Sequence, residues 1–468
     1  MNLPVSTAPE APPRALSTTA LLALLSCGFL ATYNFGSVNV ALPAIGAALH
    51  TSHAWLELIM GGYAMCLAAL LILGGRLGDA FGRRRVLLTG MIAFAVITSL
   101  TALAPDAAGI VVLRCLQGMA SALTVPQVLA VIQATTTGHA RVRAVGMFGG
   151  VAGFGGGVGM VLGGVLAGLG PEGWRLTLWV AVAIAVIALP GIGFVPETRE
   201  QQRPPLDPVG VALLAALILA VLVPITLGPG TGWPLWTLLV LAISLPLLAG
   251  LLWWEHRYAR TTGIPVLPGS VLGLRPMQVG LACTGIFFAG YGAFMYEYAL
   301  ATQSGMGYSA VRSGVSLASF ALSFLVVSLL SGRLPWSAAT TLRNGCLGQA
   351  AALLLLAGAV VAGWPAPPEW LVQIGLLLLG SSQALIFGPL VQTVMAQVPA
   401  HIAGLSGGLF STTQQLFLAV GVAAYGAVFT VAAAHWGFGA AFAIGTSIQA
   451  ASALVILLLT RLTRSSGS

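Results

Sequence analysis

The sequence predicts an all-α membrane protein, and its composition supplies the first two reasons. Of its 468 residues, 58% are hydrophobic and only 6% are Asp, Glu, Lys or Arg. Soluble domains carry roughly 25% charged residues, because they must cover their surface with polar groups. The formal net charge is +8, but the basic residues are spread over short loops. The composition therefore excludes a soluble enzyme, and it does not indicate a nucleic-acid partner.

A third observation gives the number of spans. A bilayer core about 30 Å thick requires about 20 apolar residues per helix. Fourteen such stretches follow one another along the chain. They are 17–42, 53–74, 86–104, 108–133, 142–166, 175–195, 208–228, 234–254, 276–301, 310–331, 342–362, 370–396, 403–430 and 437–460.

The loops test this number independently. All 19 basic residues are arginines, and sixteen fall on one side if the N-terminus is cytoplasmic. They are Arg14, Arg76, Arg83, Arg84, Arg85, Arg141, Arg143, Arg199, Arg203, Arg257, Arg260, Arg275, Arg333, Arg343, Arg461 and Arg464. Arg175 and Arg312 face outward, and Arg114 lies within a span. This positive-inside bias predicts that both termini are cytoplasmic. The absence of Lys and the frequent Ala and Gly suggest a GC-rich bacterial genome, so we expect a bacterial plasma membrane.

A glycine- and arginine-rich segment follows the second predicted span. It contains Gly75, Asp79, Gly82, Arg83 and Arg84. We expect a tight cytoplasmic turn, in which the glycines permit close helix approach and the Asp sits at a helix N-terminus. The segment resembles the G-x-L-x-D-x-x-G-R-[KR] signature of the major facilitator superfamily. An ordinary positive-inside loop is the alternative, but it requires neither the Asp nor both glycines.

The span 108–133 carries Arg114 and Gln117, and it resembles the R-x-x-Q-G element of the same family. An arginine within a span costs roughly 2.5–3.5 kcal/mol on insertion scales, so it is expected to face a partner or a wet cavity. One interpretation is a role in proton relay or charge pairing. The alternative is a structural ion pair that only holds helices together.

The span 142–166 is a stripe of glycines, and small residues let helix backbones approach closely in lipid. It resembles the antiporter motif that ends G-P-x-x-G-G in the drug-efflux branches. Here the ending contains Gly159, Met160, Gly163 and Gly164. The close packing is expected to be retained, but Met160 replaces the proline that would give a hinge.

The span 17–42 contains Asn34 in a segment that resembles the D-x-T-x-V-N-V-A-L-P element of fourteen-helix drug:proton antiporters. Asn34 stands where that element has Asp, and an amide cannot titrate. If the carboxylate carries the proton in relatives, this protein must use another group or none.

Two acidic residues remain within predicted spans, Glu57 and Glu297. Helical spacing puts Phe287, Tyr291, Phe294 and Tyr298 on one face beside Glu297. Aromatic surface beside a carboxyl group suits lipophilic, often cationic, ligands. The alternative is a lipid-facing stripe with Glu297 snorkelling or structurally paired.

Our hypothesis is that the titrating carboxylate has moved from the first span to its pseudo-symmetric partner, 276–301. Proton-coupling candidates are thus Glu297, Arg114 and Glu57. Candidates for the substrate pocket are Asn34, Gln117, Phe287, Tyr291, Phe294, Tyr298 and Gln303. Gln303 belongs to a segment that resembles the family's Q-x-x-x-G-Y-S junction.

The resemblance extends from about residue 28 to 426 and implies a major facilitator fold. It predicts an N-terminal six-helix half (16–195), an inserted helix pair (208–256) and a C-terminal six-helix half (275–462). The prolines of the first fifteen residues predict a disordered tail (1–15), and the charges with Pro204-Pro205 predict a cytoplasmic linker (196–207). Gly332-Arg333-Leu334 echoes Gly75-Arg76-Leu77, as expected of two repeated halves.

The function implied is secondary active export of small lipophilic compounds (drugs, antibiotics or secondary metabolites) by alternating access, with proton antiport. No G-x-x-x-x-G-K-[ST] motif is present, so we expect neither ATP use nor a cofactor. The six histidines lie at span edges or in loops, which argues against an enzyme. The alternatives are a uniporter or importer without proton coupling, and a receptor or scaffold that no longer transports. We expect a monomer whose partners are its substrate, protons and the lipid bilayer.

Overall fold

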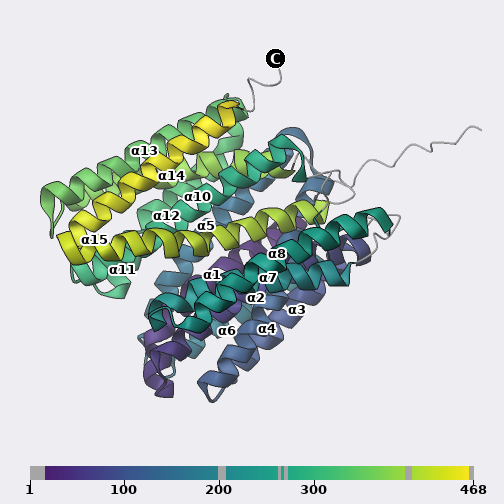
Figure 1. Cartoon of the computed structure of the whole chain (residues 1–468), viewed down its shortest axis with the longest axis horizontal. Helices are drawn as coiled ribbons and strands as arrows, with labels where there is room; N and C mark the ends of the chain where they lie inside the picture. Colours follow the sequence, from purple (N-terminus) through teal and green to yellow (C-terminus); the bar gives the residue numbers. More distant parts are fainter. Residues whose placement is uncertain (1–15, 199–206, 262–264, 268–271, 396–402, 463–468) are drawn as a thin grey trace, which may run out of the picture.

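The computed structural model describes residues 16–198, 207–261, 265–267, 272–395 and 403–462, and within these ranges the chain is helical without β-strands. Thirteen of the described helices are long and apolar enough to cross a membrane. The last of them, α15 (Ala403–Leu462), is interrupted at Gly437, whose φ of 81° and ψ of 166° are not helical. Figure 1 shows the chain reversing direction there, so α15 forms a first arm (403–436) and a second arm (438–462). The described chain thus contains the fourteen spans that the sequence predicts.

The helices fall into three successive groups in the chain. The first contains α1 (Thr18–Leu49), α2 (His53–Phe81), α3 (Arg83–Leu103), α4 (Ala107–Thr135), α5 (Gly138–Ala167) and α6 (Gly173–Ile192). The second contains α7 (Pro208–Thr231) and α8 (Leu235–Thr261). The third contains α10 (Arg275–Leu300), η1 (Ala301–Gly305), α11 (Ala310–Ser316), α12 (Ala318–Leu330), η2 (Ser331–Arg333), α13 (Ala338–Gly363), α14 (Glu369–Met395) and α15.

Two differences from the sequence-based expectation bear on the motifs. Helix α2 continues to Phe81, so Gly75 and Asp79 lie on the helix and not in a loop. Asp79 is therefore in the last turn of α2 and not at a helix N-terminus, and Gly82 alone forms the turn. The predicted span 310–331 is divided into α11 and α12 at Leu317. Apolar length gave the spans, but it could not show that a helix continues past its apolar part.

The helices pack as two bundles with the inserted pair against the first one. In the first bundle α1 packs on α5 and α6, and α2 packs on α4; in the other, α10 packs on α15, and α13 packs on α14 and α15. Figure 1 shows α7 and α8 side by side, and contacts join α7 to α2. The bundles meet where α5 contacts α12 and α14, and where α2 and α4 contact α15. The tail 1–15 and linker residues 199–206 lie outside the described residues, and the domain limits stay predictions.

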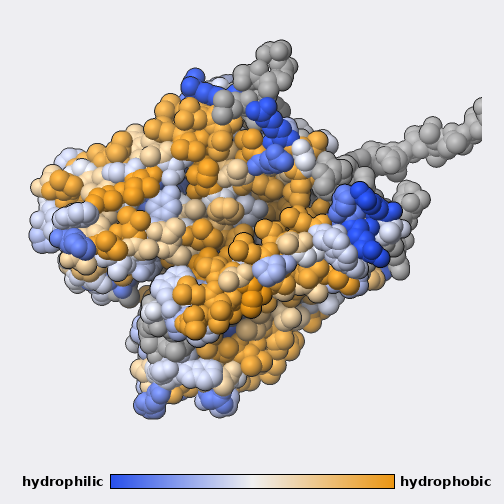
Figure 2. Space-filling model, in the orientation of Figure 1, coloured by the Kyte–Doolittle hydropathy of each residue, from blue (hydrophilic) through white to orange (hydrophobic). Residues whose placement is uncertain are grey.

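The outer surface is apolar over the length of the helices. Figure 2 shows hydrophobic residues across the middle of the visible face and hydrophilic residues toward its ends. On α8, Leu235, Leu245 and Trp253 have exposed fractions of 71%, 70% and 63%. Such a surface is stable only in lipid, so the protein is a multi-pass membrane protein. We call the end that contains Arg83 the arginine end and the opposite end the Gly437 end.

Candidate functional site

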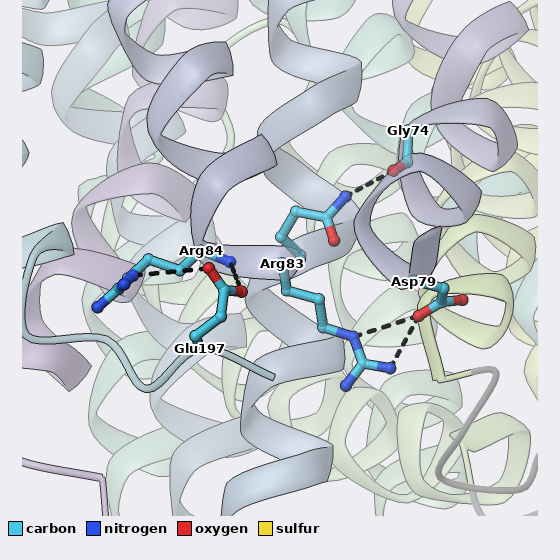
Figure 3. A network of polar contacts seen from close by, with 6 residues as sticks. Gly74, Asp79, Arg83, Arg84 and Glu197 are labelled. Carbon is cyan, nitrogen blue, oxygen red and sulfur yellow. Dashed lines mark hydrogen bonds and ion pairs between the residues drawn. The ribbon is translucent and has the colours of Figure 1, made fainter. Parts of the chain in front are cut away.

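The signature at the arginine end forms a polar network that joins α2, α3 and α4 (Figure 3). The Asp79 carboxylate accepts hydrogen bonds from Arg83 Nη2 at 2.8 Å and Nε at 3.2 Å. Asp79 is 1% exposed and Arg83 is 4% exposed, so this is a buried ion pair. Gln127 Nε2 of α4 donates to the Gly74 carbonyl oxygen at 2.7 Å. These contacts fix the arginine end of the first bundle.

The segment that follows α6 binds the start of α3 next to this network. The Arg84 backbone N–H donates to Glu197 Oε1 at 3.2 Å, and Arg84 Nε lies 3.7 Å from Glu197 Oε2. Gly82 has a φ of +103°, and a Cβ added there would lie 2.7 Å from Glu197 Oε1. Arg76 donates to the Pro265 and Val266 carbonyl oxygens. The signature therefore ties α3 to the segment before the inserted helix pair and α2 to the segment after it. Gly75 is a buried residue within α2.

A second polar network lies inside the first bundle. Arg114 Nη1 donates to Gln117 Oε1 at 2.5 Å, and Arg114 Nε donates to the Ile59 carbonyl oxygen at 3.1 Å. Gln117 Nε2 donates to Thr98 Oγ1 at 2.6 Å and to Asn34 Oδ1 at 3.4 Å. Asn34, Arg114 and Gln117 are each 0% exposed. The structure thus brings Asn34 of α1 into contact with Gln117 of α4, which is 83 residues away in the chain.

The glycine stripe of α5 packs in two directions. A Cβ added at Gly163 would lie 2.7 Å from the Ser37 Cα of α1, and one at Gly159 would overlap the Tyr33 carbonyl oxygen. On another side, a Cβ at Gly153 would lie 2.8 Å from the Phe324 ring of α12, and one at Gly149 would overlap the Phe387 ring of α14. The stripe therefore fixes α1 inside its own bundle and also receives two aromatic rings from the other bundle.

Glu297 lies inside the second bundle and faces the second arm of α15. Its Oε2 accepts a hydrogen bond of 2.8 Å from Gln449 Nε2, and a Cβ at Gly445 would overlap the carboxylate. Glu297 is 0% exposed. It is neither lipid-facing nor at the contact between the two bundles.

The predicted aromatic face is part of a larger cluster of rings. Phe294 packs on Tyr298, Phe320 and Phe442, with ring centroids 5.7, 6.4 and 6.3 Å apart. Tyr291 contacts Phe320, which leads through Phe324 to Phe387 at centroid distances of 6.4, 6.4 and 6.3 Å. Phe287 packs edge-on against Phe288 at 5.0 Å. The cluster runs from the interior of the second bundle to the rings that touch α5.

A pocket is present near the Gly437 end of the second bundle. Its lining includes Tyr298, Tyr308, Glu369, Gln373 and Phe442. Of the predicted pocket residues, only Tyr298 contributes to this lining. Gln303 is exposed on η1, and Glu57 is half-buried near the start of α2.

The register of the two bundles shows where Glu297 lies relative to Asn34 of the pseudo-symmetric helix. In the first bundle, a Cβ at Gly36 approaches the Gly156 carbonyl oxygen, and one at Gly159 approaches that of Tyr33. In the second, a Cβ at Gly292 approaches the Leu418 carbonyl oxygen, and one at Gly421 approaches that of Ala289.

These matching contacts align α1 with α10. In this alignment Gly290 is the residue equivalent to Asn34, and Ala41 is the residue equivalent to Glu297. Glu297 is therefore not the pseudo-symmetric counterpart of Asn34 but lies about two turns nearer the Gly437 end.

Sequence reasoning missed Gln449, Phe320, Phe324, Phe387 and Phe442. An inventory of amide side chains within spans, beside the inventory of carboxyl groups, would have singled out Gln449. The phenylalanines gave no such signal, because a buried Phe and a lipid-facing Phe look alike in an apolar helix.

Comparison with known proteins agrees with this architecture. A family profile described as Major Facilitator Superfamily matches residues 24–422. The chain is 29% identical over 431 residues to a protein named probable actinorhodin transporter from Streptomyces coelicolor, covering 91% of this chain and 75% of that one. It is 31% identical over 460 residues to the puromycin resistance protein pur8 of Streptomyces alboniger (94% and 89% covered). It is 30% identical over 428 residues to the cephamycin export protein CmcT of Amycolatopsis lactamdurans (87% and 84% covered).

Solved structures share the fold at low identity. The proton:xylose symporter XylE superposes with a TM-score of 0.67 at 16% identity, covering 94% of each chain. The human organic anion transporter MFSD10 gives a TM-score of 0.67 at 18% identity, covering 96% of this chain and 100% of that one.

Proposed function

Because this chain belongs to the major facilitator superfamily, we propose that it is a secondary active exporter of small lipophilic compounds such as an antibiotic or a secondary metabolite. One observation carries the proposal: relatives named for antibiotic export or resistance match over nearly the whole chain. Family membership also makes the protein a transporter and not an enzyme.

The packing between the bundles supports alternating access. Where α5 contacts α12 and α14, the α5 side consists of glycines, and the other side consists of Phe324, Leu325 and Ser328 of α12 and Phe387 of α14. A helix face without side chains offers few projecting groups to interlock with the other bundle, so the bundles can rock against each other. Two buried networks, around Arg114 and around Glu297, stiffen the interior of each bundle so that it moves as a unit.

Proton antiport is the proposed source of energy, and Glu297 is the proposed proton carrier. It is a buried carboxylate with one amide partner, in the bundle that also contains the aromatic cluster. Asn34 favours a second candidate, a uniporter or importer without proton coupling, because the titratable group of the related antiporters is absent from α1. A receptor or scaffold that no longer transports remains the third interpretation.

The proposed orientation has the arginine end and both termini in the cytoplasm of a bacterial plasma membrane. The described arginines of the α2–α3 and α4–α5 connections lie together at that end, as the positive-inside rule requires. We propose a monomer, since each bundle buries its own polar networks within one chain.

The decisive experiment measures accumulation of the fluorescent cation ethidium in bacteria that lack their major exporters. Cells that express the protein should accumulate several-fold less dye than cells with the empty vector, and a protonophore should remove the difference. A difference that persists with the protonophore would favour transport without proton coupling. If cells with and without the protein accumulate the same amount of ethidium, and also of actinorhodin, puromycin and cephamycin, export would be contradicted.

A further inference from the structure

Arg114 is a charged group without a countercharge inside the membrane. It is 0% exposed, and no carboxylate of the described residues lies within ion-pair distance of it. Its contacts are the Ile59 carbonyl oxygen, the Gln117 side-chain oxygen and the face of the Tyr63 ring, whose centroid is 4.5 Å from the guanidinium carbon. All three partners are neutral.

Neutral dipoles do not remove the net charge. A buried ion keeps an effective penalty of several kcal/mol unless an opposite charge lies beside it. A water molecule could accept hydrogen bonds from the guanidinium, but it would leave the charge uncompensated. The first bundle therefore favours a negative charge next to Arg114.

Two hydrogen-bond donors in this network are unused. Arg114 Nη2 and Asn34 Nδ2 are buried, and neither has a hydrogen-bond partner among the described residues. Gln117 contacts both side chains, because it accepts from Arg114 Nη1 and donates to Asn34 Oδ1. Both unused groups can only donate, so what satisfies them must be an acceptor.

We propose that Arg114 Nη2 and Asn34 Nδ2 together bind one monovalent anion. Its chemistry is a single negative charge with free lone pairs, supplied by a halide ion or by a carboxylate. The halide source is independent of the proposed function, whereas a carboxylate borne by the exported compound rests on it. Asn34 decides this property: an Asp at the same position would supply the negative charge from the chain itself, and an Asn leaves it to a ligand.

Thermal unfolding of the purified protein in detergent tests the site without any transport measurement. The apparent Tm is measured in sodium chloride, sodium acetate and sodium sulfate at matched ionic strength. A ligand that binds only the folded protein raises its stability with the logarithm of concentration above Kd. Wild-type protein should show a saturable rise in Tm of a few degrees in chloride or in acetate, relative to sulfate.

The variant Asn34→Asp should lose this rise, because its own carboxylate neutralises Arg114. Asn39→Asp is the matched control, since it makes the same change at an exposed position of the same helix; it should retain the rise. Arg114→Gln removes the charge and should also lose the rise, and it decides the question if Asn34→Asp does not fold.

The salts separate the two sources: a response to chloride alone indicates a halide site, and a response to acetate indicates a carboxylate site. Equal Tm values in the three salts for the wild-type protein would overturn the proposal. So would an undiminished rise in Asn34→Asp or in Arg114→Gln. Failure of the ethidium experiment would leave these results unaffected, so the two proposals can fail separately.

Discussion

The carboxylate of Glu297 in α10 accepts a hydrogen bond of 2.8 Å from the side-chain amide of Gln449 in the second arm of α15. Gly445 lies against the same carboxylate, where any side chain would collide with it. A buried acid is therefore held inside the second bundle by one neutral donor and a missing side chain. This relationship makes Glu297 a site that can gain and lose a proton without breaking an ion pair.

Glu297→Gln should abolish proton-driven transport and leave expression and folding intact. A glutamine side chain fills the same space and can still accept the hydrogen bond from Gln449, but it cannot titrate. The measurement is ethidium transport into inverted vesicles under an imposed pH gradient, with Glu57→Gln as the matched control. Unchanged pH-dependent transport in Glu297→Gln would rule out Glu297 as the proton carrier.

The double variant Gly149→Ala/Gly153→Ala should lower transport about tenfold or more. Each added methyl group meets an aromatic ring of the other bundle, Phe387 or Phe324, and separates the surfaces that must close. Gly156→Ala is the control in the same helix, because an added Cβ there has no atom within 4 Å. Whole-cell dye efflux compares the three proteins; equal efflux would show that this contact does not govern transport.

Asp79→Asn should destabilise the protein by about 3–5 kcal/mol, since it leaves the buried guanidinium of Arg83 without its countercharge. Glu197→Gln makes the same type of change in a half-exposed pair and should cost about 0–1 kcal/mol. Thermal unfolding in detergent distinguishes them. Similar melting temperatures for both variants would contradict the assignment of Asp79–Arg83 as the pair that holds the arginine end.

Gly437→Ala should destabilise the turn between the two arms of α15 by about 1–3 kcal/mol, because a φ of 81° strains any residue with a Cβ. Gly358→Ala lies within α13 where an added Cβ meets no atom within 4 Å, and it should be neutral or slightly stabilising. The readout is again the apparent Tm. A neutral Gly437→Ala would mean that the turn relaxes into another conformation.

Much of the architecture could be predicted from apolar length and loop charge. The predicted limits of α7, 208–228, agree at the start with Pro208 and differ by three residues at the end. The limits of α2 were wrong by seven residues at its end, because Gly75 to Phe81 are too polar for an apolar window and are stabilised by packing and by the Asp79–Arg83 pair. Hydropathy indicates which residues can lie in the apolar core of the bilayer. Whether a helix continues beyond that core depends on the contacts that its polar side chains make.

The same distinction decides which residues of the candidate site could be predicted from the sequence. Arg114, Gln117 and Asn34 could be chosen from the sequence because polar groups in lipid-length spans are costly, and their mutual contact followed in the structure. Gln449 and the rings of Phe324 and Phe387 could not be chosen, because their roles arise only from elements far apart in the chain.

By itself, the sequence determined that this is a fourteen-span membrane protein of one family, because the cost of polar groups in lipid is a property of each residue. It also determined that α1 has an amide, Asn34, at the aspartate position of the antiporter element that this segment resembles. Only the tertiary structure decided that Glu297 faces Gln449 and that its equivalent position in α1 is Ala41 and not Asn34. It also decided that Arg114 has no carboxylate partner among the described residues. Those facts depend on helix register and rotation, which are set by side-chain packing between helices, and no local pattern encodes them.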